Sequence, residues 1–220
     1  MRIFQVGFNR CGTRALTDFF EVGGLQCIHW DSGRLAQTLE ANQHAGLPIL
    51  TSLETFDFYA DMEYVTESKI IEAYRWHRTI LDQVADSKFI LNVRDVDDWV
   101  ASRLRHPGYA SCYERYYDLD RAAVVRKWRH DWHEHHAAVR DEIPPDRLLV
   151  FDVSRDDPVE LCDFAELPRA FASNFTQANE SMSVAGRYVR ELAPVALKKR
   201  LRPATRARLI RSLRRRSWLK

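Results

Sequence analysis

The sequence predicts an α/β domain with three layers, in which helices cover both faces of a central, mostly parallel β-sheet. Short apolar segments suited to buried strands alternate along the chain with longer segments whose apolar residues recur at helical spacing. Residues 88–93 (KFILNV) are the clearest strand, because a continuous apolar run is typical of a parallel strand covered on both faces. At 220 residues, the chain has the length of one ordinary domain with a short appendage.

Four strands and six helices are predicted from these patterns. The strands lie at residues 2–6, 25–29, 88–93 and 147–153. The helices lie at residues 15–22, 32–45, 68–84, 95–104, 119–142 and 158–166. Ser32 is expected to cap the second helix, and residues 47–66 are expected to be irregular.

The distribution of charge divides the chain into two parts. Residues 187–220 hold thirteen Lys and Arg against one acidic residue, whereas residues 1–186 hold twenty against thirty. We therefore predict a folded domain over 1–186 and a basic amphipathic tail over 187–220. Such a tail suits an anionic membrane surface, another polyanion, the acidic body of the protein or solvent. It contains no motif for sequence-specific nucleic-acid binding.

Cysteine usage and hydropathy favour a cytoplasmic protein, with peripheral membrane contact through the tail as an option. The four cysteines are far apart and include no CxxC pair, which argues against a zinc ribbon or a disulfide framework. The sequence has no run of eighteen apolar residues, so no membrane-spanning helix is predicted. The first apolar stretch is too short for a signal peptide.

A glycine-containing loop at residues 7–14 (GFNRCGTR) joins the first predicted strand to the first helix. Gly7 and Gly12 allow successive backbone amides to converge, and the positive end of the helix dipole adds to their attraction for phosphate. The Gly-x4-Gly spacing matches a triphosphate-binding loop. However, Thr13 and Arg14 stand where such a loop has Lys followed by Ser or Thr.

Two further observations bear on this loop. The strand at residues 88–93, which could have ended in a metal-binding carboxylate, is followed by Arg94, so a metal-assisted ATPase or kinase is disfavoured. Two glycines can also form a plain strand–helix turn that binds nothing. The side-chain donors of Arg10, Thr13 and Arg14 favour a phosphate site over that simpler explanation.

Residues 6–16 (VGFNRCGTRAL) resemble the 5′-phosphosulfate loop of the sulfotransferase family, in the branch with Arg-x-Gly-Thr where the best-known cytosolic enzymes have Lys. That family has a P-loop-type fold and uses 3′-phosphoadenosine 5′-phosphosulfate (PAPS) as co-substrate, without a metal. The resemblance implies that Arg10 neutralises charge on the bridging oxygen as the S–O bond breaks. It also implies that five backbone amides hold the 5′-phosphosulfate: Cys11, Gly12, Thr13, Arg14 and Ala15.

A second part of the resemblance concerns the family's 3′-phosphate site, a strand followed by Arg and, eight residues later, Ser. Arg94 and Ser102 have this spacing here, and together they would hold a phosphate that ATP lacks. The resemblance extends to about residue 181 through segments similar to the family's closing strand, helix and loop: residues 146–153, 161–164 and 175–179. The tryptophan expected after Asp152 is absent.

His29 follows the second predicted strand directly, about where the family places its general base. Imidazole titrates near neutral pH, which suits that role, although a histidine between a strand and a loop is in general more often structural. The alternatives are four nearby carboxyl groups: Asp31, Asp57, Asp61 and Glu63. Asp61 resembles a position that this branch keeps acidic, so we group it with His29 and Arg10 as catalytic candidates.

Residues 130–136 (HDWHEHH) invite a metal-binding interpretation, because histidines three residues apart can share one face of a helix. The segment has no HExxH pattern, no nearby cysteine and no second cluster to complete a site. We therefore predict no metal, and we expect Trp128, Trp132 and Val139 to form the buried stripe of a helix.

The resemblance thus implies a PAPS-dependent sulfotransferase that acts on a hydroxyl or amine acceptor, which could be a small molecule, a carbohydrate or a lipid. Two other functions stay open. One is a degenerate P-loop module that docks on a membrane or polyanion through the basic tail. The other is a nucleotide kinase. Adenosine 3′,5′-bisphosphate bound to the purified protein would distinguish the first function from both alternatives.

Overall fold

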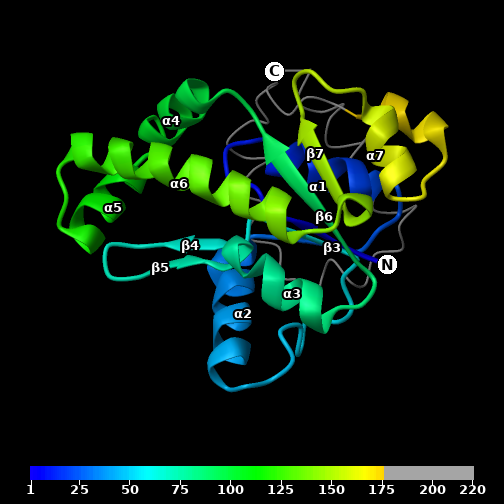
Figure 1. The fold of residues 1–220 in the computed structure, drawn as a ribbon, viewed down its shortest axis with the longest axis horizontal. Coiled ribbons are helices and arrows are strands. Elements are labelled where there is room, and N and C mark those ends of the chain that lie inside the picture. The colour runs from blue at the N-terminus through cyan, green and yellow to red at the C-terminus, as the bar shows by residue number, and fades with distance from the viewer. Residues whose placement is uncertain (176–220) are drawn as a thin grey trace, which may run out of the picture. The chain divides into compact units, whose positions relative to one another are not determined.

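Five parallel strands form the central sheet of the computed structural model, in the spatial order β2-β3-β1-β6-β7 (Figure 1). They are β1 (Arg2–Gln5), β2 (Cys27–His29), β3 (Phe58–Ala60), β6 (Ser87–Val93) and β7 (Leu148–Asp152). Every neighbouring pair in this sheet is parallel, which confirms the predicted α/β class. The structure describes residues 1–175, so the predicted boundary at residue 186 and the basic tail lie outside the described residues.

Helices cover both faces of the sheet, and the alternation of side chains along β1 shows how. Ile3 packs on one face with helices α1 (Thr13–Val22) and α7 (Pro158–Phe164). Phe4 points to the opposite face, where the larger core includes α6 (Arg121–Glu142). Figure 1 shows α1 behind the sheet and α6 in front of it, so the three predicted layers are present.

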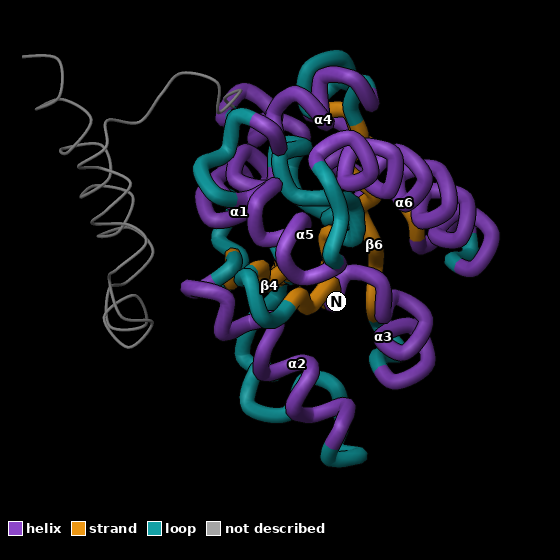
Figure 2. Tube along the Cα trace, turned by 90° about the vertical axis from the view of Figure 1, so that its left-hand side faces the viewer, coloured by secondary structure: helices purple, strands orange, loops and turns teal. Residues whose placement is uncertain are grey.

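The remaining elements extend the α6 side of the molecule. They are α2 (Arg34–His44), β4 (Glu63–Val65), β5 (Ile70–Glu72), α3 (His77–Gln83), α4 (Val96–Leu104) and α5 (Tyr109–Tyr117). Strands β4 and β5 form a separate antiparallel ribbon. Helix α5 lies against β4 and α6, and its place beside β4 is visible in Figure 2.

The predicted helix at residues 68–84 is wrong. The segment forms β5, a 3-10 turn at Ala73–Trp76 and then the short helix α3. Ile70 and Ile71 are β-branched and pair with β4, and this pairing outweighs the helical spacing of the sequence. The prediction of irregular structure over 47–66 also missed β3 and β4, and α5 was not anticipated.

The start of α2 differs from the prediction as well. Ser32 does not cap the helix, because it lies with Trp30 and Asp31 in a turn whose φ angles are all positive. The Trp30 amide donates to the Ala60 carbonyl (3.0 Å), which ties this turn to β3. Helix α2 begins after the turn, at Arg34. Across residues 1–175, no helix has both the length and the apolar character needed to span a membrane.

Candidate active site

Hydrogen bonds from β6 fix the loop between β1 and α1. The side-chain amide of Asn92 donates to the carbonyl oxygens of Phe8 (3.1 Å) and Cys11 (3.0 Å). The side-chain amide of Gln5 donates to Asn92 Oδ1 (2.5 Å). A Cβ on Gly7 would lie 2.4 Å from the Asn92 carbonyl oxygen, so only glycine fits this close approach. The sheet therefore fixes the inner side of the loop.

Helix α1 begins immediately after Gly12, whose φ of 83° and contact with Val153 both require glycine. The first hydrogen bond of this helix runs from the Leu16 amide to the Gly12 carbonyl (3.1 Å). No side chain caps the N-terminus, and its first turn contains no acidic residue. A helix N-terminus of this kind attracts an anion through its leading amides and its dipole.

Three of the predicted donor-binding residues lie together at this edge of the sheet. Arg10 Nε donates to Ser102 Oγ (3.1 Å), and Arg94 donates to the Arg10 carbonyl oxygen (2.9 Å). Desolvation lowers the pKa of Arg10, Asp61 opposes that shift, and the charges of Arg94 and Arg105 add to it. The loop, β6 and α4 thus bring several positive charges close together, which favours the binding of an anion.

The two proton-transfer candidates are also neighbours. His29 Nε2 lies 3.1 Å from Thr13 Oγ1 and 3.5 Å from Asp61 Oδ2. They meet because β2, β3 and β1 are adjacent, so the residues that follow these parallel strands lie at one edge. Burial, together with the charge of Glu63, raises the pKa of Asp61 to about 7, and nearby arginines oppose the shift.

The other predicted acids have different contacts. Asp31 forms an ion pair with Arg34 (2.9 Å) in the turn before α2. Asp57 precedes β3 and accepts a hydrogen bond from the Gln26 amide (2.8 Å), at the opposite edge of the sheet. Among the four carboxyl groups, Asp61 is the one that forms an ion pair with His29. Backbone strain marks this place too, because Asp61 has a φ of 55°.

Cys11 is part of the loop but has the properties of a core residue. Its side chain is buried, and burial raises the pKa of the thiol to about 12, so the sulfur is neutral at physiological pH. Sequence reasoning missed two residues that fix the loop, Gln5 and Asn92. A signal was present, because each is a polar residue inside an otherwise apolar strand.

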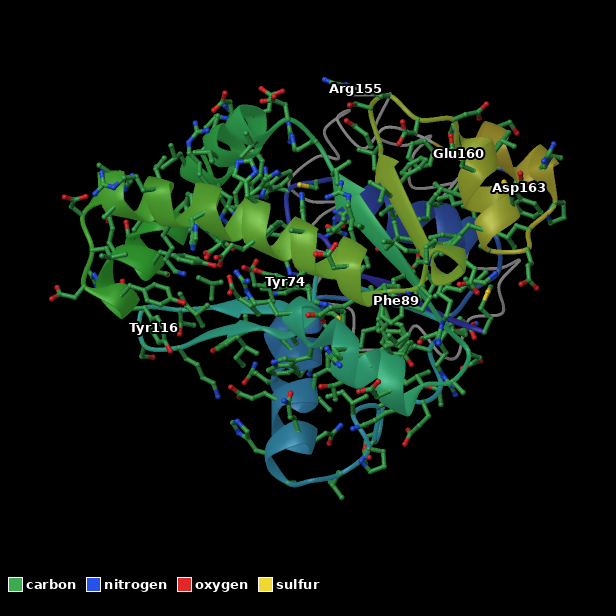
Figure 3. All side chains as sticks on the ribbon, viewed as in Figure 1. Tyr74, Phe89, Tyr116, Arg155, Glu160 and Asp163 are labelled. Carbon is green, nitrogen blue, oxygen red and sulfur yellow. The ribbon has the colours of Figure 1, made fainter. Side chains whose placement is uncertain are left out.

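The histidine-rich part of α6 is divided between surface and core. His130 is exposed and pairs with Glu134 (3.1 Å), whereas His135 and His136 are buried among aromatic rings. Burial lowers the pKa of His135 to about 4 and that of His136 to about 3. Tyr74, labelled in Figure 3, lies with its ring centroid 5.1 Å from that of His135. No group of metal-binding side chains occurs within residues 1–175.

The predicted stripe of α6 is confirmed, since Trp128, Trp132 and Val139 are all buried. This helix therefore supports the core beneath the loop of residues 7–14. His135 contributes directly to that support, because its Nε2 lies 2.6 Å from the Val6 carbonyl oxygen at the start of the loop.

Comparison with known proteins identifies the family. Residues 2–108 and 105–184 match the sulfotransferase domain, so the match covers most of the chain. A search of curated proteins found no match. The family match supports a transferase enzyme with sulfotransferase activity in general. The chain belongs to the sulfotransferase family.

Proposed function

We propose that this sulfotransferase transfers the sulfuryl group of PAPS to a hydroxyl or amine acceptor, which is a small molecule, a carbohydrate or a lipid. The observation that carries the proposal is the grouping of Arg10, Arg94 and Ser102 beside the uncapped start of α1. PAPS has two separate anionic groups, the 5′-phosphosulfate and the 3′-phosphate. The proposal assigns a separate set of hydrogen-bond donors to each.

The 5′-phosphosulfate is assigned to the amides of residues 11–15, and the 3′-phosphate to Arg94 and Ser102. Arg10 lies between these two groups, because its side chain contacts Ser102 while its backbone belongs to the loop. In this proposal its guanidinium neutralises charge on the bridging oxygen when the S–O bond breaks. A fixed cation at the point where charge develops is an efficient way to lower a barrier.

In the proposed reaction, the acceptor oxygen or nitrogen attacks sulfur, and the bond from sulfur to the bridging phosphate oxygen breaks. The products are the sulfated acceptor and adenosine 3′,5′-bisphosphate. The acceptor proton passes to His29, and Asp61 at 3.5 Å stabilises the imidazolium that forms. Because the pKa of Asp61 is raised to about 7, Asp61 is the second candidate for the base.

Titration calorimetry with adenosine 3′,5′-bisphosphate tests the donor assignment. We expect the bisphosphate to bind more tightly than AMP or ATP, because only it presents the 3′-phosphate. Arg94→Ala should weaken its affinity roughly 10- to 100-fold, the effect of losing one charge-assisted hydrogen bond, while AMP binding stays the same. Equal bisphosphate affinity of wild type and Arg94→Ala would contradict the assignment.

The same measurement separates the alternatives. A kinase would prefer ATP with magnesium, and a module that only docks on polyanions would not discriminate among the three nucleotides. Labelled PAPS with a panel of phenols, sugars and lipids then identifies the acceptor. With that acceptor, His29→Ala should lower kcat by ~10²–10⁴ and leave bisphosphate affinity unchanged. If only Asp61→Asn is inactive, Asp61 is the base.

A further inference from the structure

Arg103 follows Ser102 on α4, but its side chain points into the core rather than toward solvent. Only 1% of the side chain is exposed. The guanidinium carbon lies 4.4–5.8 Å from five aromatic ring centroids, those of Phe8, Trp99, Tyr109, Tyr113 and Trp128. Aromatic faces attract a cation, but they do not replace the hydrogen bonds that a buried charge needs. The hydrogen-bond partners of Arg103 therefore indicate its role.

Arg103 has two polar partners, which come from different segments of the chain. Arg103 Nε donates to Asn9 Oδ1 (3.0 Å), which belongs to the phosphate loop. A terminal nitrogen of the same guanidinium donates to Glu63 Oε1 (3.2 Å) at the start of β4. The Glu63 side chain is 3% exposed, so this is a buried ion pair that supplies the counter-charge.

Asn9 is held at two further atoms. Its side-chain amide donates to the Tyr109 hydroxyl (3.1 Å), and its carbonyl oxygen accepts from Trp99 Nε1 (3.1 Å). Helices α4 and α5 thus hold the residue immediately before Arg10 on three atoms. Asn92 holds the loop from the sheet side, so the loop is fixed from two directions.

The loop needs this support because of the backbone conformation of Arg10, the residue after Asn9. Arg10 has a φ of 64°, a conformation that is unfavourable for a residue with a side chain and persists only where the surroundings enforce it. The strained backbone directs Arg10 to Ser102, at the place assigned above to the donor. If Asn9 can rotate, the Arg10 backbone can relax and its side chain leaves that place.

We propose that Arg103 is a positioning residue that fixes the phosphate loop through Asn9 and thereby sets the affinity for the donor nucleotide. Glu63 keeps the guanidinium in place, and the fork of the guanidinium allows one side chain to bond Asn9 and Glu63 together. Lysine has the same charge but lacks this planar fork, so it cannot reproduce both contacts. The inference rests on the proposed function, because the donor nucleotide is the ligand whose affinity it concerns.

The test measures the Kd of adenosine 3′,5′-bisphosphate for full-length Arg103→Lys, Asn9→Ala and the double variant. Each single substitution should raise Kd by ~10-fold, which corresponds to the loss of one hydrogen bond. The double variant should be no weaker than the weaker single variant, because both substitutions remove the same contact. Arg147→Lys is the matched control. Arg147 donates to the carbonyl oxygens of Ser87 (2.7 Å) and Val84 (3.1 Å), at the opposite edge of the sheet.

The control variant should have a lower melting temperature but a Kd within about twofold of wild type. If Arg103 had a purely structural role, Arg103→Lys would give this same result. A folded Arg103→Lys with wild-type Kd overturns the inference, as do single effects that multiply in the double variant. If Arg103→Lys does not fold, Asn9→Ala decides, since a wild-type Kd in that variant excludes positioning through Asn9. Failure of the wild type to bind the bisphosphate would instead refute the proposed function.

Discussion

Helices α1 and α4 both begin at the carboxyl edge of the sheet, after the paired strands β1 and β6, but their N-termini are built from different residues. Asp95 caps α4 by accepting hydrogen bonds from the amides of Asp97 (2.9 Å) and Asp98 (3.0 Å). Those bonds lower the pKa of Asp95. The start of α4 thus carries its own negative charge, whereas the start of α1 has no acidic residue and no side-chain cap.

A glycine before the helix does not by itself distinguish α1. Helices α2 and α5 also follow glycines with positive φ, Gly33 and Gly108. The distinguishing feature of α1 is the group of arginines beside it. Close packing of the glycine does not distinguish it, because a Cβ on Gly33, before α2, would lie 2.2 Å from the Tyr64 ring. The protein thus satisfies the start of α4 with its own carboxylates, whereas it places none at the start of α1, where we propose that the anionic donor binds.

The largest effect on bisphosphate affinity is expected from Gly12→Ala. The new Cβ would lie 2.6 Å from Val153 in a backbone with a φ of 83°, so the loop must move. We expect bisphosphate affinity to fall by ~100-fold or more, since the helix amides would no longer meet at one point. Calorimetry on the folded variant measures this.

Gly108→Ala is the matched control for that substitution. Gly108 also precedes a helix with positive φ, but a Cβ there has no atom within 4 Å. It should cost ~1 kcal/mol of stability and leave bisphosphate affinity unchanged. Similar affinity losses in both variants would mean that α1 is no more specialised for the ligand than α5.

Sequence reasoning located the α1 region well, because strand, glycine loop and helix are adjacent along the chain. Residues 2–6 and 88–93 were predicted as strands, and they bring the loop and Arg94 to one edge. The contact of Arg10 with Ser102 follows from that placement. Local patterns carried this information because both strands are short apolar runs with little competing helical character.

The supporting residues could not be found in the same way. An arginine on a helix is usually exposed, so no pattern marks Arg103 as buried until α5 and β4 close around it. Strand β5 was missed for a similar reason, since its conformation depends on pairing with β4. Contacts between segments distant in the chain determine the burial of Arg103 and the conformation of β5. The spacing of residues within one segment does not predict such contacts.

A second prediction compares Asp61, beside α1, with Asp95 at the start of α4. The pKa of Asp61 is about 7 in the folded protein against an ordinary value of 3.8, so the folded state binds the proton more tightly than the unfolded state. Ionisation of Asp61 therefore costs stability as pH rises from about 4 to 7. The stability of Asp61→Asn relative to wild type should increase by on the order of 4 kcal/mol between pH 4 and pH 8.

Urea unfolding at both pH values measures this difference, and the remaining titrating groups cancel in the comparison with wild type. Asp95→Asn should behave in the opposite way, because the pKa of Asp95 is lowered and its benefit is present at neutral pH and lost in acid. If Asp61→Asn shows no change between the two pH values, the Asp61 carboxyl is solvated like an ordinary surface group.

The smallest effect is expected from Asp95→Ala, which removes the cap of α4. Two amides at the helix start lose their acceptor, and we expect the melting temperature to fall by ~2–4 °C. Bisphosphate affinity should stay within about twofold of wild type, because Ser102 lies near the other end of the helix and Arg10, not the cap, contacts it. Scanning calorimetry and titration calorimetry on one preparation provide both values. A tenfold loss of affinity would show that the start of α4 also positions the ligand, and the contrast between the two helix starts would then not hold.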